Sequence, residues 1–185
     1  MAHHSFFPTL TQLLLLSLLG LPITGSYAET LSSPFAVKAK ILPGCILGSG
    51  TADSSNFGTL NFGNISSLST AINIVSSQNA GSIIIQCSGT PSITLALNSG
   101  ANTTGNISAG RRLVNSNTGE YLFYQIFQDS ARSIIWGNGS NGGTTQVITA
   151  NSTLQQIVLY AQLFACSTFP TAGNYTDTLL VTVTY

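Results

Sequence analysis

The chain ends on a run of alternating apolar and polar residues that reaches the final position. Leu179, Val181, Val183 and Tyr185 fall on one side of an extended backbone, and the residues between them fall on the other. Chain ends are usually polar and frayed. A strand like this one therefore belongs either inside a sheet or at an edge that another strand covers. We expect the second arrangement, which is typical of a subunit that assembles with others.

The first residues have the pattern of an export signal. Leu13–Leu21 is an apolar run broken only by Ser17 and Gly20, and Ser26-Tyr27-Ala28 is a small-x-small cleavage site. The sequence predicts a signal peptide over residues 1–28 and one domain over residues 29–185, a length that can bury a core of its own.

Charge is scarce in this chain. Charged residues make up 5% of it and the formal net charge is +0, whereas about 25% is ordinary. Five Lys and Arg residues cannot form the basic face that nucleic-acid binding requires, so we expect no nucleic-acid partner. Few charges together with many Ser, Thr and Asn residues favour an extracellular β-protein.

Three cysteines lie in the exported part, and in an oxidising compartment two of them should pair. Cys45 and Cys87 each lie beside a strand-like run, which makes them the expected disulfide. Cys166 is then left over. We interpret it as a small buried apolar residue, with an intermolecular bridge or a reactive thiol as the alternative.

Short strands separated by Gly, Asn and Ser clusters run through the whole domain and favour an all-β sandwich. Leu154–Phe164 is long enough for a helix, but its β-branched and aromatic residues favour a strand. The expected strands are Phe35–Leu42, Phe57–Phe62, Ala71–Val75, Ser82–Cys87, Ile93–Leu97, Tyr121–Phe127, Ser133–Trp136, Val147–Thr149, Leu154–Phe164 and Thr178–Tyr185.

The sequence gives little support for catalysis. Its only histidines, His3 and His4, lie in the signal peptide, so no imidazole is left for general base work or for a metal. Glu120 and Asp129 are a conceivable glycosidase pair, but nothing in their spacing brings them together. We expect no enzyme, no catalytic residue, no cofactor-binding residue and no metal site.

Other polar and aromatic residues have ordinary structural explanations. Arg111 and Arg112 could bind an anion, although an ion pair at a strand edge or in a loop is more usual. Asp177 is expected to accept backbone hydrogen bonds in the turn before the last strand. A third group could line a sugar site, but core packing explains it better; its members are Tyr121, Phe123, Tyr124, Phe127 and Trp136.

Taken in order, these segments resemble the spore coat protein U domain found in Csu-type pilins of the archaic chaperone–usher class. The resemblance covers essentially all of residues 29–185, and the ordered set is more specific than any one piece. The segments that carry it are the alternating strand reaching Cys45, Phe57–Gly63, Ile85–Ser88, Leu95–Gly100, Arg111–Leu113, Tyr121–Asp129, Trp136-Gly137 and Ala172–Thr178.

This resemblance implies an incomplete immunoglobulin-like sandwich that lacks one strand and is completed by a donor strand. A periplasmic chaperone would lend the strand first, and the N-terminal segment of the next identical or related subunit would then replace it at an outer-membrane usher. The implied location is a fimbrium at the cell surface, reached through the periplasm. An edge that exposes backbone donors and an apolar groove suits this exchange.

In this chain the candidate donor segment is residues 29–37. Leu31, Phe35 and Val37 would fill pockets of the acceptor, with the small Ser33 between them. The acceptor would use the terminal strand, through Leu179, Val181, Val183 and Tyr185. The resemblance thus implies a structural pilus subunit that supports adhesion and biofilm formation.

Three alternatives remain beside this interpretation. The chain could be a secreted spore-coat-type structural protein, the branch that names the family. It could be a sugar-binding adhesin domain, which an open, apolar-lined pocket with clustered Tyr and Trp would favour. A small secreted enzyme is the third, disfavoured by the missing histidine.

Overall fold

The computed structural model describes residue 34 and residues 36–42, 44–48, 56–168 and 170–185. The chain divides into two units, residues 1–39 and residues 40–185. In the first unit the described residues are Pro34 and residues 36–39, and all of them are exposed and outside regular secondary structure. The predicted signal peptide lies outside the described residues.

The second unit is built from β-strands, and within its described residues there is no helix. No described helix is therefore long and apolar enough to cross a membrane. The strands are β1 (Cys45–Leu47), β2 (Ile72–Val75), β3 (Ile83–Cys87), β4 (Ser92–Leu97), β5 (Arg111–Asn115), β6 (Tyr121–Phe127), β7 (Gln146–Thr149), β8 (Gln155–Ile157), β9 (Tyr160–Leu163), β10 (Tyr175–Thr176) and β11 (Val181–Thr184).

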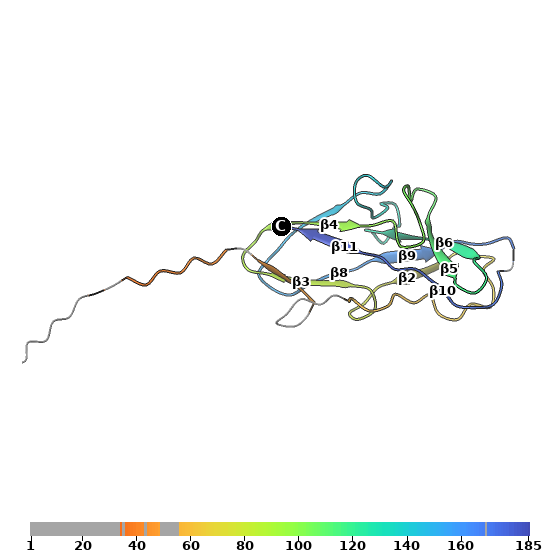
Figure 1. Ribbon diagram of the computed structural model, residues 1–185, viewed down its shortest axis with the longest axis horizontal. Helices are drawn as coiled ribbons and strands as arrows, with labels where there is room; N and C mark the ends of the chain where they lie inside the picture. Colours follow the sequence, from red (N-terminus) through yellow and green to blue (C-terminus); the bar gives the residue numbers. More distant parts are fainter. Residues whose placement is uncertain (1–33, 35, 43, 49–55, 169) are drawn as a thin grey trace, which may run out of the picture. The chain divides into compact units, whose positions relative to one another are not determined.

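These strands form three antiparallel sheets, with the orders β1-β3-β8, β10-β5-β6-β9-β2 and β11-β4-β7. The chain repeatedly leaves one sheet and joins another, for example from β3 to β4, from β8 to β9 and from β10 to β11. The three sheets are thereby connected into one domain (Figure 1).

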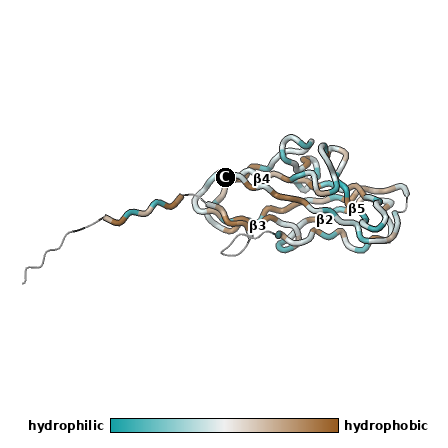
Figure 2. The backbone as a smooth tube through the Cα atoms, in the orientation of Figure 1, coloured by the Kyte–Doolittle hydropathy of each residue, from teal (hydrophilic) through white to brown (hydrophobic). Residues whose placement is uncertain are grey.

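One apolar core lies between the sheets. In Figure 1, β4 and β11 lie in one layer and β3 and β8 in the other, and the most apolar stretches follow the strands, with polar residues along the loops (Figure 2). Inward-facing side chains of β3, β4, β6 and β9 belong to a single buried cluster; among them are Ile83, Ile85, Ile93, Leu95, Leu97, Leu122, Tyr124, Ile126, Ala161 and Leu163. The all-β prediction is confirmed.

Most of the expected strands are present. The predictions for Ala71–Val75, Ser82–Cys87, Tyr121–Phe127 and Val147–Thr149 agree with β2, β3, β6 and β7 to within a residue or two. Three strands were not predicted, β1, β5 and β10. β5 and β10 hold polar or charged residues, so neither has the apolar run that marks a strand.

The prediction of a strand over Phe57–Phe62 is wrong. Asn56 and Asn61 each accept a hydrogen bond, at 2.8 Å, from the backbone N–H of the glycine two residues later. Gly58 and Gly63 both have a φ of 85°, which a strand does not allow. Phe57, Leu60 and Phe62 still pack against the core, so the apolar pattern reflects burial without a sheet.

The strand predicted over Phe35–Leu42 is also absent. Its described residues, 36–42, are exposed and lie outside any strand, and the first described strand of the domain begins only at Cys45. An alternating segment becomes a strand only beside a partner that accepts its backbone hydrogen bonds.

Leu154–Phe164 is extended, as predicted, but it forms two strands. β8 pairs with β3, and after residues 158–159 β9 pairs with β2 and β6. At the crossing the backbone N–H of Leu159 donates to the buried hydroxyl of Ser76 at 2.7 Å, and this hydroxyl also contacts that of Ser82 at 2.8 Å. Ser76 thus satisfies a buried amide at the point where the chain changes sheets.

We predict that Ser76→Ala lowers the free energy of unfolding by about 1–3 kcal/mol, because it leaves that amide buried without an acceptor. Urea denaturation measures the change. Ser77→Ala is the matched control, since the Ser77 side chain is exposed. Equal stability of the two variants would show that Ser76 is not needed at the crossing.

Candidate functional site

The terminal strand forms an edge of its sheet. β11 pairs with β4 along one side, in a register that places Val181 opposite Leu97 and Thr184 opposite Thr94. No described strand pairs with its other side. β1 occupies a corresponding position in the β1-β3-β8 sheet, since it pairs only with β3. Each of the three sheets has two edge strands, and β1 and β11 are two of these edges.

The apolar face of this segment is only partly covered. Leu179, Val181 and Val183 are half-buried and pack against the core, whereas Leu180 is 64% exposed. Tyr185 follows the last residue of β11 and is 59% exposed. A strand laid beside β11 would bury more of this apolar surface and would pair the open backbone groups.

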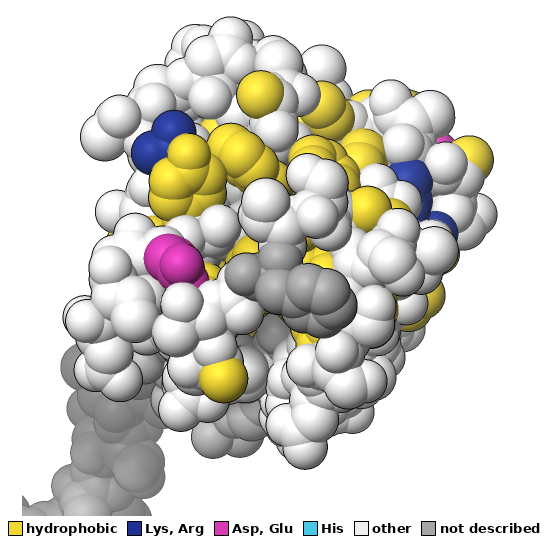
Figure 3. Space-filling model, turned by 90° about the vertical axis from the view of Figure 1, so that its right-hand side faces the viewer, with side chains coloured by type: hydrophobic (Ala, Val, Ile, Leu, Met, Phe, Trp, Pro, Cys, Tyr) yellow, Lys and Arg dark blue, Asp and Glu magenta, His cyan; other side chains and the backbone are white. Residues whose placement is uncertain are grey.

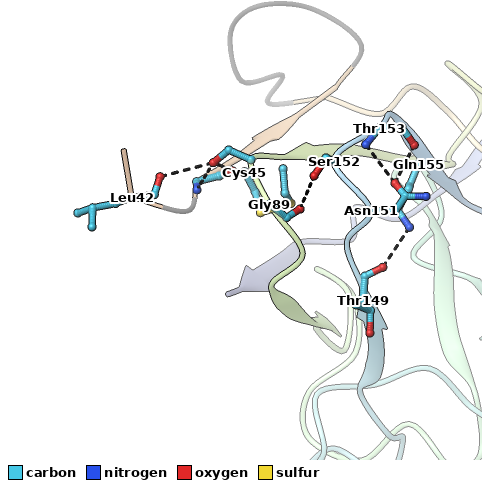
Figure 4. The surroundings of a disulfide bond; sticks show 11 residues. Leu42, Cys45, Gly89, Thr149, Asn151, Ser152, Thr153 and Gln155 are labelled. Atoms are coloured by element: carbon cyan, nitrogen blue, oxygen red, sulfur yellow. Dashed lines mark hydrogen bonds between the residues drawn. A yellow bond between two sulfur atoms is a disulfide. The ribbon is translucent and has the colours of Figure 1, made fainter. Parts of the chain in front are cut away.

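A disulfide fixes the other edge. Cys45 and Cys87 are joined, as predicted, and they face each other in the register of β1 and β3. Gly44 and Ser88 continue this pairing, because the N–H of Ser88 donates to the carbonyl of Gly44 at 2.8 Å. Figure 4 shows Cys45, one of the two bonded cysteines, and its surroundings. β1 has only three residues, and this covalent bond joins it to β3 in addition to the backbone pairing.

Asp177 anchors the chain just before β11. Its Oδ1 accepts hydrogen bonds from the backbone N–H groups of Ala101 and Asn102, at 2.9 and 3.1 Å. Hydrogen bonds from backbone N–H groups were expected from the sequence. The hydroxyl of Tyr124 also donates, to Oδ2 at 2.7 Å, and this contact was not expected. Gly100 is required here, since a Cβ at its position would lie 2.2 Å from the same carboxylate.

The Tyr124 hydroxyl is held in its protonated form. Burial raises the pKa of Tyr124, and the negative charge of Asp177 raises that pKa further. The bond between them connects β6, in the middle of its sheet, to the segment that leads into β11.

Arg111 is buried, and neither explanation offered for it from the sequence is correct. Its guanidinium donates to the carbonyls of Asn98 (2.9 Å) and Trp136 (2.7 Å) and to the side-chain oxygen of Gln125. Burial lowers the pKa of Arg111. The two carbonyls hold the guanidinium inside the domain. The guanidinium thereby connects Asn98, in the loop after β4, to Trp136, in the loop after β6.

The proposed donor residues lie in the first unit. Leu31, Ser33 and Phe35 are outside the described residues, and Val37 is 84% exposed with no strand partner. Their role stays a prediction.

Cys166 is half-buried and free. It packs against the core and also lines an open pocket of about 500 Å³, together with Leu68, Thr168 and other small residues. Its sulfur lies 3.4 Å from the hydroxyl of Thr168, and hydrogen bonding to Thr168 lowers the pKa of the thiol. The expected burial is thus only partial.

The aromatic residues divide into two groups. Tyr124, Phe127 and Trp136 are buried, as core packing predicts. Tyr121 and Phe123 are exposed, contrary to that prediction. The pocket beside Cys166 has no Tyr or Trp in its described lining, so it is not the aromatic cleft that a sugar-binding adhesin was expected to show.

Glu120 and Asp129 lie beyond opposite ends of β6, and a seven-residue strand separates its ends by roughly 20 Å. Paired glycosidase carboxylates lie within about 10 Å of each other. Each carboxylate also has partners of its own. Glu120 accepts from Thr171 and Tyr175, and Asp129 accepts from Ser133 and Ile134.

We predict that Cys45→Ser lowers the free energy of unfolding by about 4 kcal/mol in the chain-entropy model and reduces the yield of exported protein. Thermal melting and periplasmic yield measure the two effects. Cys166→Ser is the matched control, because Cys166 has no disulfide. An unchanged melting temperature for Cys45→Ser would show that the disulfide does not stabilise the edge.

We predict that Tyr124→Phe weakens the pH dependence of stability above pH 10. The folded state holds the Tyr124 proton more tightly than the unfolded state does, because its pKa is raised from 10.0. Stability is therefore full below pH 10 and declines as the pH rises above it. Urea midpoints between pH 8 and pH 11 measure this decline. Parallel curves for the wild type and the variant would contradict it.

Comparisons with known proteins agree with the ordered motifs. The Spore Coat Protein U domain family matches residues 31–182. Protein U of Myxococcus xanthus is 28% identical over 163 residues, which cover 85% of this chain and 87% of that protein.

A solved structure is also similar, the chaperone–tip adhesion subunit pre-assembly complex from the archaic chaperone–usher Csu pili of Acinetobacter baumannii. Its identity is 24% and its TM-score 0.47 over 78% of this chain, which spans 40% of the matched chain. Because the family match covers most of the sequence, this chain belongs to the Spore Coat Protein U domain family.

Proposed function

We propose that this protein is a structural subunit of a surface pilus or fimbria, assembled by the chaperone–usher pathway through donor-strand exchange. The observation that carries the proposal is the open edge of β11, where half-buried Val181 and Val183 lie beside backbone groups that no described strand pairs. An edge of this kind binds an extended segment through main-chain hydrogen bonds and pockets for alternate side chains.

The segment before β1 has the properties of a donor. Val37 and Ile41 are 84% and 86% exposed, and the lysines at 38 and 40 alternate with them. Large apolar side chains left in water cost free energy that burial in a groove would recover, at about 25 cal/mol per Å². We assign residues 29–37 as the donor, with Leu31, Phe35 and Val37 entering the acceptor and Ser33 between them.

Before assembly, the open edge needs a temporary partner, because an unpaired edge promotes aggregation. The expected partners are a periplasmic chaperone, an outer-membrane usher and further subunits of the same or a related kind. In the Csu complex, a chaperone and a pilus subunit are bound together. The protein would then pass through the periplasm to the cell surface and support adhesion and biofilm formation there.

The second candidate function is a secreted structural protein of the spore-coat type. It is favoured by the similarity to Protein U, 87% of which aligns with this chain. A complete domain that needs no strand from another subunit would fit this function better than the first.

We predict that Phe35→Asp blocks polymerisation but still allows a one-to-one chaperone complex, since a charge cannot enter an apolar pocket unpaired. The mass distribution of the periplasmic protein, co-expressed with its proposed chaperone, measures this. Ser32→Asp is the matched control, because it places the same charge on the outward side of the segment.

Deletion of residues 30–37 should have the same effect as Phe35→Asp. Normal fibres from Phe35→Asp would show that the donor is assigned wrongly. A stable monomer from every variant, with no chaperone bound, would instead support the coat-type protein.

A further inference from the structure

The outer face of the five-stranded sheet exposes two aromatic rings beside one arginine. Tyr121 and Phe123 alternate along β6 with the buried residues Leu122 and Tyr124, so both rings point away from the core. They are 47% and 36% exposed. The β5–β6 register places Arg112 opposite Phe123, which brings the guanidinium to the same face.

The three side chains form one contact group. The guanidinium carbon of Arg112 lies 4.6 Å from the centre of the Tyr121 ring and 5.8 Å from that of Phe123. The two rings meet edge to face with their centres 5.2 Å apart. Ring contacts of this kind hold a guanidinium in place and leave the N–H groups at its edge available.

The charge of Arg112 has no counterpart within the described residues. Its guanidinium has no hydrogen bond or ion pair there, whereas Arg111 beside it makes several. The described carboxylates are already occupied: Asp129 by Ser133 and Ile134, Asp177 by backbone N–H groups and Tyr124, and Glu120 by Thr171 and Tyr175. Within the described residues, no carboxylate is therefore left to pair with Arg112.

Exposed aromatic rings next to an unpaired cation define the chemistry of the ligand. On one side of the molecule, basic side chains are few and lie beside exposed hydrophobic ones (Figure 3). The negative face of an aromatic ring attracts polarised C–H groups, such as those on the flat face of a sugar ring. A planar carboxylate matches the paired N–H groups of a guanidinium. A single cation is too little for the phosphates of a nucleic acid.

We propose that Arg112, Tyr121 and Phe123 form a binding surface for an acidic polysaccharide. A uronate carboxylate binds the Arg112 guanidinium, and a sugar ring packs on the exposed aromatic side chains. This surface belongs to β5 and β6 and does not use the open edges of β1 and β11. The proposal therefore stands whether the chain assembles into pili or into a coat.

Isothermal titration of the secreted full-length protein with a galacturonic acid oligomer tests the proposal. We expect Arg112→Gln and Phe123→Leu each to weaken binding at least tenfold, because the first removes the charge and the second removes the ring but keeps an apolar side chain. Lys40→Gln is the charge-matched control, since it removes one positive charge from another exposed position.

The control should bind as the wild type does, and all variants should keep the wild-type melting temperature. A neutral glucose oligomer and a polyglutamate peptide serve as comparison probes, and we expect the wild type to bind both at least tenfold more weakly. Equal loss from Lys40→Gln, equal affinity for polyglutamate or for the neutral oligomer, or no binding of the galacturonic acid oligomer would each overturn the proposal.

Discussion

An unpaired strand edge is the physical constraint on which the rest of this domain depends. Backbone N–H and C=O groups need partners, and a half-buried apolar face needs cover. β11 has a neighbour on one side only, and its own side chains Val181 and Val183 are incompletely buried. β1 forms the edge of another sheet; it has three residues and is joined to β3 by a disulfide. The rest of the molecule holds these edges in position, so that the open side is a stable feature of the fold.

Buried polar bonds supply this rigidity. Asp177 joins Tyr124 of β6 to the segment that enters β11, and Arg111 binds the carbonyls of the loops after β4 and β6. Ser76 holds the chain where β8 becomes β9. Each of these groups would be costly to bury without its partner. They therefore specify one arrangement of the sheets, more than the apolar core does on its own.

The sequence allowed the fold class to be predicted because strand periodicity is local. The aromatic residues of Tyr121–Phe127 and the β-branched and aromatic residues of Leu154–Phe164 are local signals of this kind, and both segments form strands. What could not be predicted depends on distant contacts. The change of sheet at residues 158–159 is marked by Ser76, far away in the chain. The burial of Arg111 depends on the carbonyls of Asn98 and Trp136 and on the side-chain oxygen of Gln125. At Phe57–Phe62 the apolar pattern was wrongly interpreted as a strand, because the turns in which Asn56 and Asn61 accept hydrogen bonds from Gly58 and Gly63 rule a strand out.

Amide hydrogen exchange at Val181–Thr184 shows whether a strand from another subunit covers the open edge of β11. The comparison is between the assembled protein and the chaperone-free protein without residues 30–37. If another subunit supplies a strand to this edge, the β11 amides that point away from β4 exchange slowly in the assembly and rapidly in the truncated protein. The β11 amides bonded to β4 then serve as an internal reference. Equal exchange at the outward-pointing amides in both samples would contradict strand donation to β11.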